Sequence, residues 1–183
     1  MRLLRPEWDD FWFTLALMYS TRGTCDRLRA ATIIVKNKRI VGAGYNGSVG
    51  GQKHCDEIGH LIVEGHCERT LHGEENAVIN TEREDLKDAT AYLIGTPCYR
   101  CARILINSGV KEIKYLGEYK NSRGKELIRL LAKSAKVKLI SVDKDPLKLI
   151  KQATVRLEGA GGAIRIWTEN HSRLRGSSGT KPR

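Results

Sequence analysis

Large apolar residues recur near the start of the chain at the three- to four-residue spacing of one helix face. The residues on this face are Trp8, Phe11, Trp12, Leu15, Met18 and Tyr19. The spacing predicts a first helix that buries this face in a core. Two β-branched or apolar runs follow over residues 31–35 and 40–43, separated by a short polar segment. That arrangement predicts a β-hairpin.

Helical and strand patterns alternate in the second half of the chain. We expect helices over 72–83, 97–108 and 124–133, and strands over 91–94, 111–116 and 137–142. Gly109 directly follows the second of these helices and is a suitable C-cap. A hairpin followed by strand–helix alternation favours an α/β fold, in which a mixed sheet carries helices on its faces.

Two segments fall outside these regular patterns. Residues 48–70 show no clear periodicity but contain three histidines and two cysteines, and so long a loop usually has a function. From residue 159 onward the chain is basic and rich in glycine and serine. We therefore expect one domain over 1–158 and a mobile tail over 159–183. An apolar docking patch in this tail is predicted from Ile164, Ile166 and Trp167.

Composition narrows the class of protein. The chain has 183 residues, of which 40% are hydrophobic and 29% charged, as in an ordinary globular domain. This excludes a collagen, a coiled-coil rod and a wholly disordered chain. No apolar run approaches the length of a spanning helix. Trp8, Asp9 and Asp10 stand where a signal peptide needs an apolar stretch, so we expect a cytoplasmic protein.

Charge and cysteine content point toward particular partners. Lysine and arginine number 32 against 21 acidic residues, a net charge of +11. This surplus suits nucleotides, nucleic acid or an anionic membrane face, although a solvated basic surface explains it equally well. The cysteines number five, which is odd. In a cytosolic chain, metal binding or catalysis is a better explanation for them than disulfides.

Two short motifs combine the residues of a metal site at predicted helix starts. One reads His-Gly-Glu from His72, and the other reads Pro-Cys-Tyr-Arg-Cys from Pro97. Cys98 and Cys101 can point the same way from a first helical turn, whose positive dipole end favours thiolates. Two thiolates and an imidazole supply three zinc ligands and leave the fourth position for water. Glu74 is too close to His72 to be a comfortable ligand, but it can move a proton of that water.

The alternatives for these motifs are a zinc knuckle without catalysis and, for the second motif alone, a redox site. The order H-x-E…P-C-x-x-C favours a zinc-dependent nucleobase deaminase over both.

The motifs resemble those of the deoxycytidylate (dCMP) deaminase family, most closely its bacterial, phage and late-competence branch. Four stretches carry the resemblance, which covers about residues 8 to 150: 24–25, 44–47, 66–77 and 97–101. It implies a five-stranded mixed sheet between helices and the hydrolytic deamination of dCMP to dUMP, which supplies thymidylate synthesis. It also implies that His72, Cys98 and Cys101 bind zinc and that Glu74 shuttles protons. Gly73 replaces the usual alanine, so we expect a weaker helix there.

Further contacts follow from the same resemblance. Tyr45, Asn46, Asn76 and Tyr119 match residues near the nucleotide. A turn would also explain Tyr45 and Asn46, and a solvent-facing helix position would explain Asn76. Arg83 lies eleven residues after His72, about three helical turns. It can therefore share that helix face, and its planar guanidinium suits the 5′-phosphate. A solvated surface arginine is the alternative for Arg83.

A second metal site is implied for the remaining cysteines. Phage members of the family carry a structural zinc, and the matching residues here are Cys25, Cys55 and Cys67, with His60 or His66 as the fourth ligand. Such a closed site would hold a loop that has little else to bury. Simple core packing of the cysteines is the alternative.

Assembly and regulation are also expected from the resemblance. Many members are hexamers that dCTP activates and dTTP inhibits, so we expect a homo-oligomer and a nucleotide effector bound with Mg²⁺. A deaminase acting on a polynucleotide such as tRNA would suit the charge and the basic tail. Arg100, where those enzymes typically carry methionine, argues against it. A competence-associated zinc scaffold that binds DNA through the tail would not require Glu74.

Overall fold

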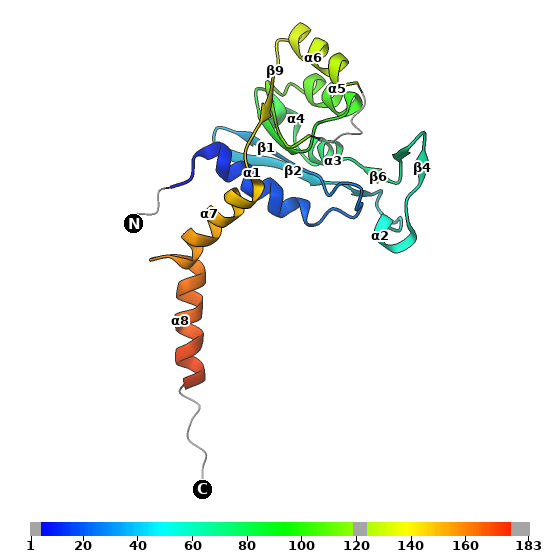
Figure 1. Ribbon diagram of the computed structural model, residues 1–183. Helices are drawn as coiled ribbons and strands as arrows, with labels where there is room; N and C mark the ends of the chain where they lie inside the picture. The colour runs from blue at the N-terminus through cyan, green and yellow to red at the C-terminus, as the bar shows by residue number, and fades with distance from the viewer. Residues whose placement is uncertain (1–4, 119–123, 177–183) are drawn as a thin grey trace.

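A five-stranded mixed sheet forms the centre of the computed structural model, which describes residues 5–118 and 124–176 (Figure 1). Its strand order is β2-β1-β7-β8-β9. The strands are β1 (Ala31–Lys36), β2 (Arg39–Tyr45), β7 (Thr90–Ile94), β8 (Glu112–Leu116) and β9 (Lys138–Val142). Strand β1 pairs antiparallel with β2 and β7, whereas β7, β8 and β9 run parallel. The predicted α/β fold with a mixed sheet is confirmed.

Local sequence explains the two kinds of connection. Asn37 and Lys38 join β1 to β2 with positive φ values of 50° and 60°, as a tight two-residue hairpin turn requires. The parallel strands need longer crossovers. Helix α5 (Tyr99–Asn107) connects β7 to β8, and α6 (Lys125–Ser134) lies between β8 and β9.

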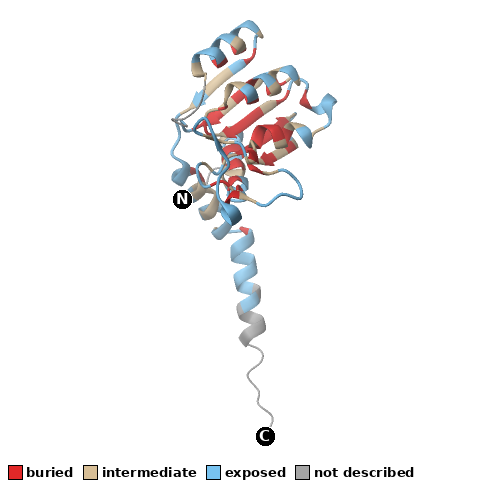
Figure 2. Ribbon diagram, turned by 90° about the vertical axis from the view of Figure 1, so that its right-hand side faces the viewer, coloured by how far each residue is buried: buried red, intermediate tan, exposed pale blue. Residues whose placement is uncertain are grey.

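Helices cover both faces of the sheet, and the buried residues gather between the layers (Figure 2). Helix α1 (Trp8–Ser20) packs on one face, with α7 (Pro146–Glu158) beside it. Their core includes Phe13, Ile33, Tyr92 and Leu149. Helices α3 (Gly73–Ile79) and α5 pack on the opposite face. Because β1 is covered on both sides, it reads as an unbroken apolar run rather than an alternating one.

Helix α7 has no counterpart among the elements predicted from the sequence. It begins at Pro146, where the missing N–H costs nothing, and the Asp145 side chain accepts a hydrogen bond from Leu147 N at 2.9 Å. An aspartate followed by a proline is a helix-start signal that could have been recognised in the sequence.

The predicted helix over 72–83 is wrong at its C-terminal end. Helix α3 stops at Ile79, and Arg83 begins a separate short helix, α4 (Arg83–Leu86). Asn80 Nδ2 donates to Asn76 O, and Thr81 Oγ1 donates to Ala77 O. These side chains satisfy the last carbonyls of α3 and compete with continued helical hydrogen bonds.

The C-terminal segment contains a helix that was not predicted from the sequence. Residues Ala163–Gly176 form helix α8, which points away from the sheet (Figures 1 and 2). Ile164, Ile166 and Trp167 are exposed on it. The domain boundary at residue 158 stays a prediction. No described helix combines the length and the hydrophobicity that membrane crossing requires.

The segment between β2 and α3 contains only short elements and extends from the edge of the sheet (Figure 1). They are β3 (Gly47–Ser48), α2 (Cys55–Ile58), β4 (Ile62–Val63), β5 (His66–Cys67) and β6 (Thr70–Leu71). We call residues 49–69 the cysteine loop. Apart from its cysteines it buries little apolar surface, and Ile62 and Val63 are each 48% exposed.

Candidate functional site

The N-terminus of α3 lies directly on the sheet because glycine permits a very close approach. A Cβ atom on Gly44 would lie 2.3 Å from both Ala77 N and Gly73 O. The expected weakening of the helix assumed an interior glycine, whereas Gly73 is the first residue of α3. A Cβ there would meet Ala31 Cα at 3.1 Å. This packing fixes the position of the residues that flank Gly73.

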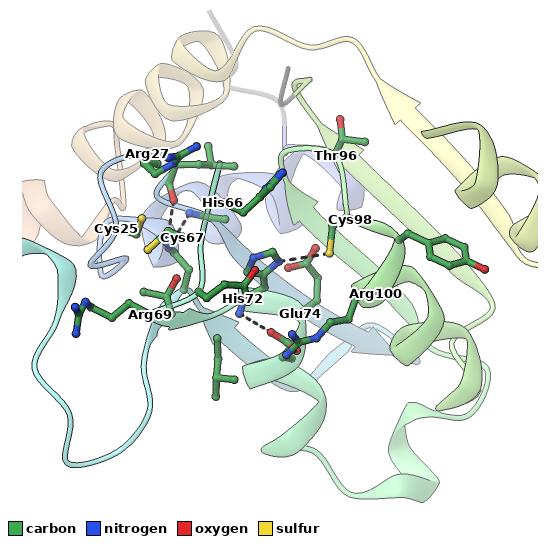
Figure 3. Close-up of a pocket in the computed structure, with 18 of the residues that line it drawn as sticks. Cys25, Arg27, His66, Cys67, Arg69, His72, Glu74, Thr96, Cys98 and Arg100 are labelled. Atoms are coloured by element: carbon green, nitrogen blue, oxygen red, sulfur yellow. Dashed lines mark hydrogen bonds and ion pairs between the residues drawn. The ribbon is translucent and has the colours of Figure 1, made fainter. Parts of the chain in front are cut away.

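The three predicted ligands of the first metal site meet at two helix starts. His72 directly precedes α3 and Cys98 directly precedes α5. His72 Nδ1 lies 3.6 Å from Cys98 Sγ and 3.3 Å from Cys101 Sγ (Figure 3). Tetrahedral zinc with ordinary bond lengths separates sulfur and nitrogen ligands by about 3.5 Å. The donor set and its spacing therefore fit zinc. We call these residues the catalytic cluster.

Electrostatics at the catalytic cluster favour a thiolate at Cys98. Hydrogen bonding to Cys101 and His72 lowers the pKa of the Cys98 thiol to about 4. The hydrogen bond with Cys98 raises the pKa of His72 to about 9. The N-termini of two helices add positive potential at the same point. A cation held here meets one thiolate, at Cys98, whereas the hydrogen bond with Cys98 and burial raise the pKa of the Cys101 thiol.

Glu74 lies beside this cluster without belonging to it. Its side chain is only 7% exposed and, with His72 and Cys98, lines the same cavity (Figure 3). Burial raises the pKa of the Glu74 carboxyl. A carboxyl group of raised pKa next to a reacting centre is suited to accepting and returning protons.

The cavity has a volume of about 510 Å³, within the usual range for small-molecule sites. One wall carries His72, Glu74 and Cys98. Two further cysteines, Cys25 and Cys67, also line the cavity and lie away from these residues (Figure 3). Three arginine side chains also line it: Arg27, Arg69 and Arg100. Glu68, Glu74 and Glu75 line the same cavity, and Arg100 is paired with Glu75. Arg27 and Arg69 thus remain as the cavity-lining guanidinium groups of the kind that binds phosphate.

A second group of ligands forms where the cysteine loop meets the segment before β1. Its members are Cys25, Cys55, His60 and Cys67, which we call the loop cluster. Cys55 Sγ and Cys67 Sγ are 3.6 Å apart, and so are Cys25 Sγ and His60 Nδ1. His60 Nε2 contacts Asp26 Oδ1 at 2.9 Å, leaving Nδ1 facing the cysteines. The four donors have the number and spacing of a closed zinc site.

The structure distinguishes the two histidines considered for this group. His60 joins the three cysteines, whereas His66 is outside the ligand group and lines the cavity.

Most of the predicted substrate contacts lie elsewhere. Tyr45, Asn76 and Arg83 are absent from the cavity lining formed by the described residues. Asn76 Nδ2 instead donates to Tyr45 O at 2.8 Å and holds α3 on β2. Placing Arg83 on one helix with His72 is wrong, because α3 ends before it. Tyr119 lies outside the described residues.

Asn46 does line the cavity, but both ends of its amide are already bound. Its Nδ2 donates to Leu28 O at 2.9 Å, and its Oδ1 accepts from Ala30 N at 3.0 Å. In this arrangement Asn46 shapes the cavity wall.

Sequence reasoning did not single out Arg27 and Arg69. Each stands two residues after a cysteine of the loop cluster, Cys25 or Cys67. Their side chains reach the cysteine loop: Arg27 Nη2 donates to Gly65 O, and Arg69 Nε donates to Gly59 O. That regular spacing was the signal available in the sequence.

An α/β sheet, an open His-Cys-Cys cluster and a buried glutamate beside it define the class of zinc-dependent nucleobase deaminases. The family described as the cytidine and deoxycytidylate deaminase zinc-binding region matches residues 6–117, and the chain belongs to this family. The resemblance drawn from the sequence is confirmed.

Individual relatives agree with this assignment. ComE operon protein 2 of Bacillus subtilis is 34% identical over 118 residues, which cover 63% of this chain and 62% of that protein. Deoxycytidylate deaminase of Mycobacterium phage D29 is 31% identical over 122 residues, covering 61% of this chain and 95% of the phage protein. The chain thus spans less than two thirds of the Bacillus protein.

A solved structure confirms the fold. The dCMP deaminase of cyanophage S-TIM5, crystallised in complex with dCMP and dUMP, has a TM-score of 0.61 and 22% identity. The match covers 76% of this chain and 99% of the phage chain.

Proposed function

We propose that this protein hydrolyses dCMP to dUMP and ammonia. The observation that carries the proposal is the catalytic cluster with Glu74 buried beside it, at the wall of a cavity lined with arginines. Relatives named deoxycytidylate deaminases, among them the phage D29 protein, support the choice of substrate. Supply of dUMP to thymidylate synthesis follows from this activity.

The residues of the site divide the chemistry between them. His72, Cys98 and Cys101 would hold the zinc, which when bound supplies a Lewis acid that lowers the pKa of water. The Glu74 carboxylate takes a proton from the attacking water and passes it to N3 of the pyrimidine as C4 is attacked. Glu74 then takes the second proton from the hydroxyl now on C4 and delivers it to the C4 amino group, which leaves as ammonia. Its burial excludes bulk water from these transfers.

Recognition of the 5′-phosphate is assigned to Arg27 and Arg69 rather than to Arg83. Both line the cavity on the side of the loop cluster. Guanidinium groups bind phosphate with charge-assisted, bidentate hydrogen bonds. These arginines would separate dCMP from the uncharged deoxycytidine.

The loop cluster is proposed to hold a second, structural zinc. Four ligands close the coordination sphere, so no position remains for water or substrate. Bound metal would fix the cysteine loop, and with it Arg27 and Arg69, against the cavity.

The hexamer, the dCTP and dTTP effectors and Mg²⁺ are proposed on the resemblance alone, and the cytoplasmic location stays a proposal. Sedimentation of the full chain, and assays with each effector and Mg²⁺, test the first three.

The test is ultraviolet-monitored deamination of dCMP, deoxycytidine and dCTP by the zinc-loaded protein, with Glu74→Ala as the control. We expect rapid loss of dCMP, little loss of deoxycytidine and none in the control. Turnover of tRNA or single-stranded DNA without turnover of dCMP would overturn the assignment in favour of a polynucleotide substrate.

A further inference from the structure

The catalytic cluster is assembled from two segments that the chain keeps apart. His72 and Cys98 are 26 residues apart in sequence and belong to the starts of α3 and α5. Coordination geometry depends on the distance between these two helix starts. A link between them would therefore set the shape of the site.

Glu75 and Arg100 form such a link. The Glu75 side chain is 7% exposed, and its Oε2 accepts a hydrogen bond from the backbone N–H of His72 at 2.9 Å. Its Oε1 accepts a hydrogen bond from Arg100 Nη2. Arg100 stands between Cys98 and Cys101 in the first turn of α5. One carboxylate thus contacts the residue that carries the imidazole and the helix turn that carries both thiols (Figure 3).

We propose that Glu75 and Arg100 are a positioning pair that holds the two halves of the catalytic cluster at their metal-binding separation. The inference rests on the proposed function and adds two residues that neither bind the metal nor move a proton. Nothing in the H-x-E or P-C-x-x-C pattern requires a charge at either position.

The burial of Glu75 explains why the pair acts as a unit. A buried carboxylate that loses its cationic partner keeps its desolvation cost, so the surrounding backbone moves to hydrate it. The backbone nearest to Glu75 is the turn that carries His72 and Glu74. Loss of Arg100 would therefore displace His72, a ligand that Arg100 does not contact. Groups that hold metal ligands from behind typically change metal affinity by about 10- to 100-fold.

The test is a double-mutant cycle of Arg100→Gln, Glu75→Gln and the double variant in the full chain. Arg103→Gln is the matched control, since Arg103 lies on the same helix but stacks over Tyr99 instead. Zinc affinity is measured by chelator competition. Spectra of bound Co²⁺ then show which cluster has lost affinity, because the catalytic cluster has two sulfur ligands and the loop cluster has three. We expect Arg100→Gln to weaken the two-sulfur site about 10- to 100-fold, with the three-sulfur loop cluster and Arg103→Gln unchanged.

Further readouts separate positioning from other roles. The two single effects should not add in the double variant, and Arg100→Lys should restore part of the affinity. The kcat for dCMP should fall while KM changes little. Additive effects, equal weakening of both clusters, or a selective rise in KM for dCMP over deoxycytidine would each overturn the proposal.

Two safeguards keep the test decisive. If Glu75→Gln does not fold, the contrast between Arg100→Gln, Arg100→Lys and Arg103→Gln decides the proposal, since these arginines are largely exposed. Metal binding is measured without turnover. A chain that binds zinc but leaves dCMP intact would refute the proposed function and still test the positioning pair.

Discussion

The two ligand clusters both contribute residues to the lining of one cavity but are held by different means. His72, Cys98 and Cys101 stand at the starts of helices that pack on the sheet, and Glu75–Arg100 joins those starts. In the loop cluster, Cys55, His60 and Cys67 belong to a segment of short elements with exposed apolar residues. The packing of these helices on the sheet thus positions the catalytic ligands, whereas the cysteine loop is proposed to depend on a metal of its own. We therefore assign the reaction to the catalytic cluster and the ordering of the cysteine loop to the loop cluster.

Removing the proton shuttle should give the largest effect. Glu74→Gln keeps the shape of the side chain and all three ligands but cannot accept a proton. We expect kcat for dCMP to fall by about 10² to 10⁴-fold. The zinc content of both clusters and the thermal unfolding of the chain should stay unchanged. Steady-state kinetics with metal analysis checks this. A variant that turns over within twofold of the parent would exclude Glu74 as the shuttle.

Removing a ligand of the loop cluster should loosen the cysteine loop without abolishing catalysis. In Cys67→Ser the three remaining donors no longer close the site, so the cysteine loop should open locally. Amide hydrogen exchange should accelerate across residues 49–69 by about 10²-fold or more, but stay unchanged in α3 and α5. Cys101→Ser provides the reverse comparison, with catalysis lost and the loop protected. Equal exchange in both variants would remove the distinction between the clusters.

The arginines near the loop cluster should control KM rather than kcat. Arg27→Gln and Arg69→Gln each remove a charged hydrogen-bond donor, so we expect KM for dCMP to rise about 10- to 100-fold. KM for deoxycytidine should change little. Arg83→Gln is the matched control, and parallel kinetics with both substrates is the measurement. A selective effect of Arg83→Gln alone would return the phosphate role to that residue.

A smaller effect is expected on the sheet face away from both clusters. Burial by itself would raise the pKa of Asp9, but hydrogen bonds from Lys114 and Tyr92 outweigh it and lower the pKa. A carboxylate with a lowered pKa stabilises the fold above its unfolded-state pKa of about 3.9, and this contribution disappears as the pH falls through the lower folded value. Asp9→Asn should therefore destabilise the chain at pH 7 but not in acid.

Urea unfolding at both pH values tests this expectation, with zinc content as the control. Loss of either metal in Asp9→Asn would show that the α1 face does influence the clusters.

The chemistry-bearing part of the site was predictable because it depends on short, local patterns. His72, Glu74, Cys98 and Cys101 lie at helix starts that the alternation of apolar segments locates. The mixed sheet followed from the same alternation. The predicted grouping of three cysteines with a histidine also corresponds to a cluster in the structure, and only the choice of His60 over His66 needed coordinates.

The remaining site residues depend on features that periodicity does not carry. Helix α3 ends at Ile79 because Asn80 and Thr81 bind its last carbonyls, and this moved Arg83 off the expected face. Arg27 and Arg69 reach the cavity through the path of an irregular loop. Glutamate and arginine are common surface residues, so nothing in the sequence indicated that packing would pair Glu75 with Arg100.

Metal content compared across three proteins tests the division between the clusters most directly. The account predicts two zinc ions per chain in the parent, one in Cys101→Ser and one in Cys67→Ser. It also predicts that Cys67→Ser still converts dCMP to dUMP, with a raised KM, while Cys101→Ser does not. No zinc at all in Cys67→Ser would contradict the claim that the fold holds the catalytic cluster independently of the loop, and one zinc in the parent would contradict the proposed second metal.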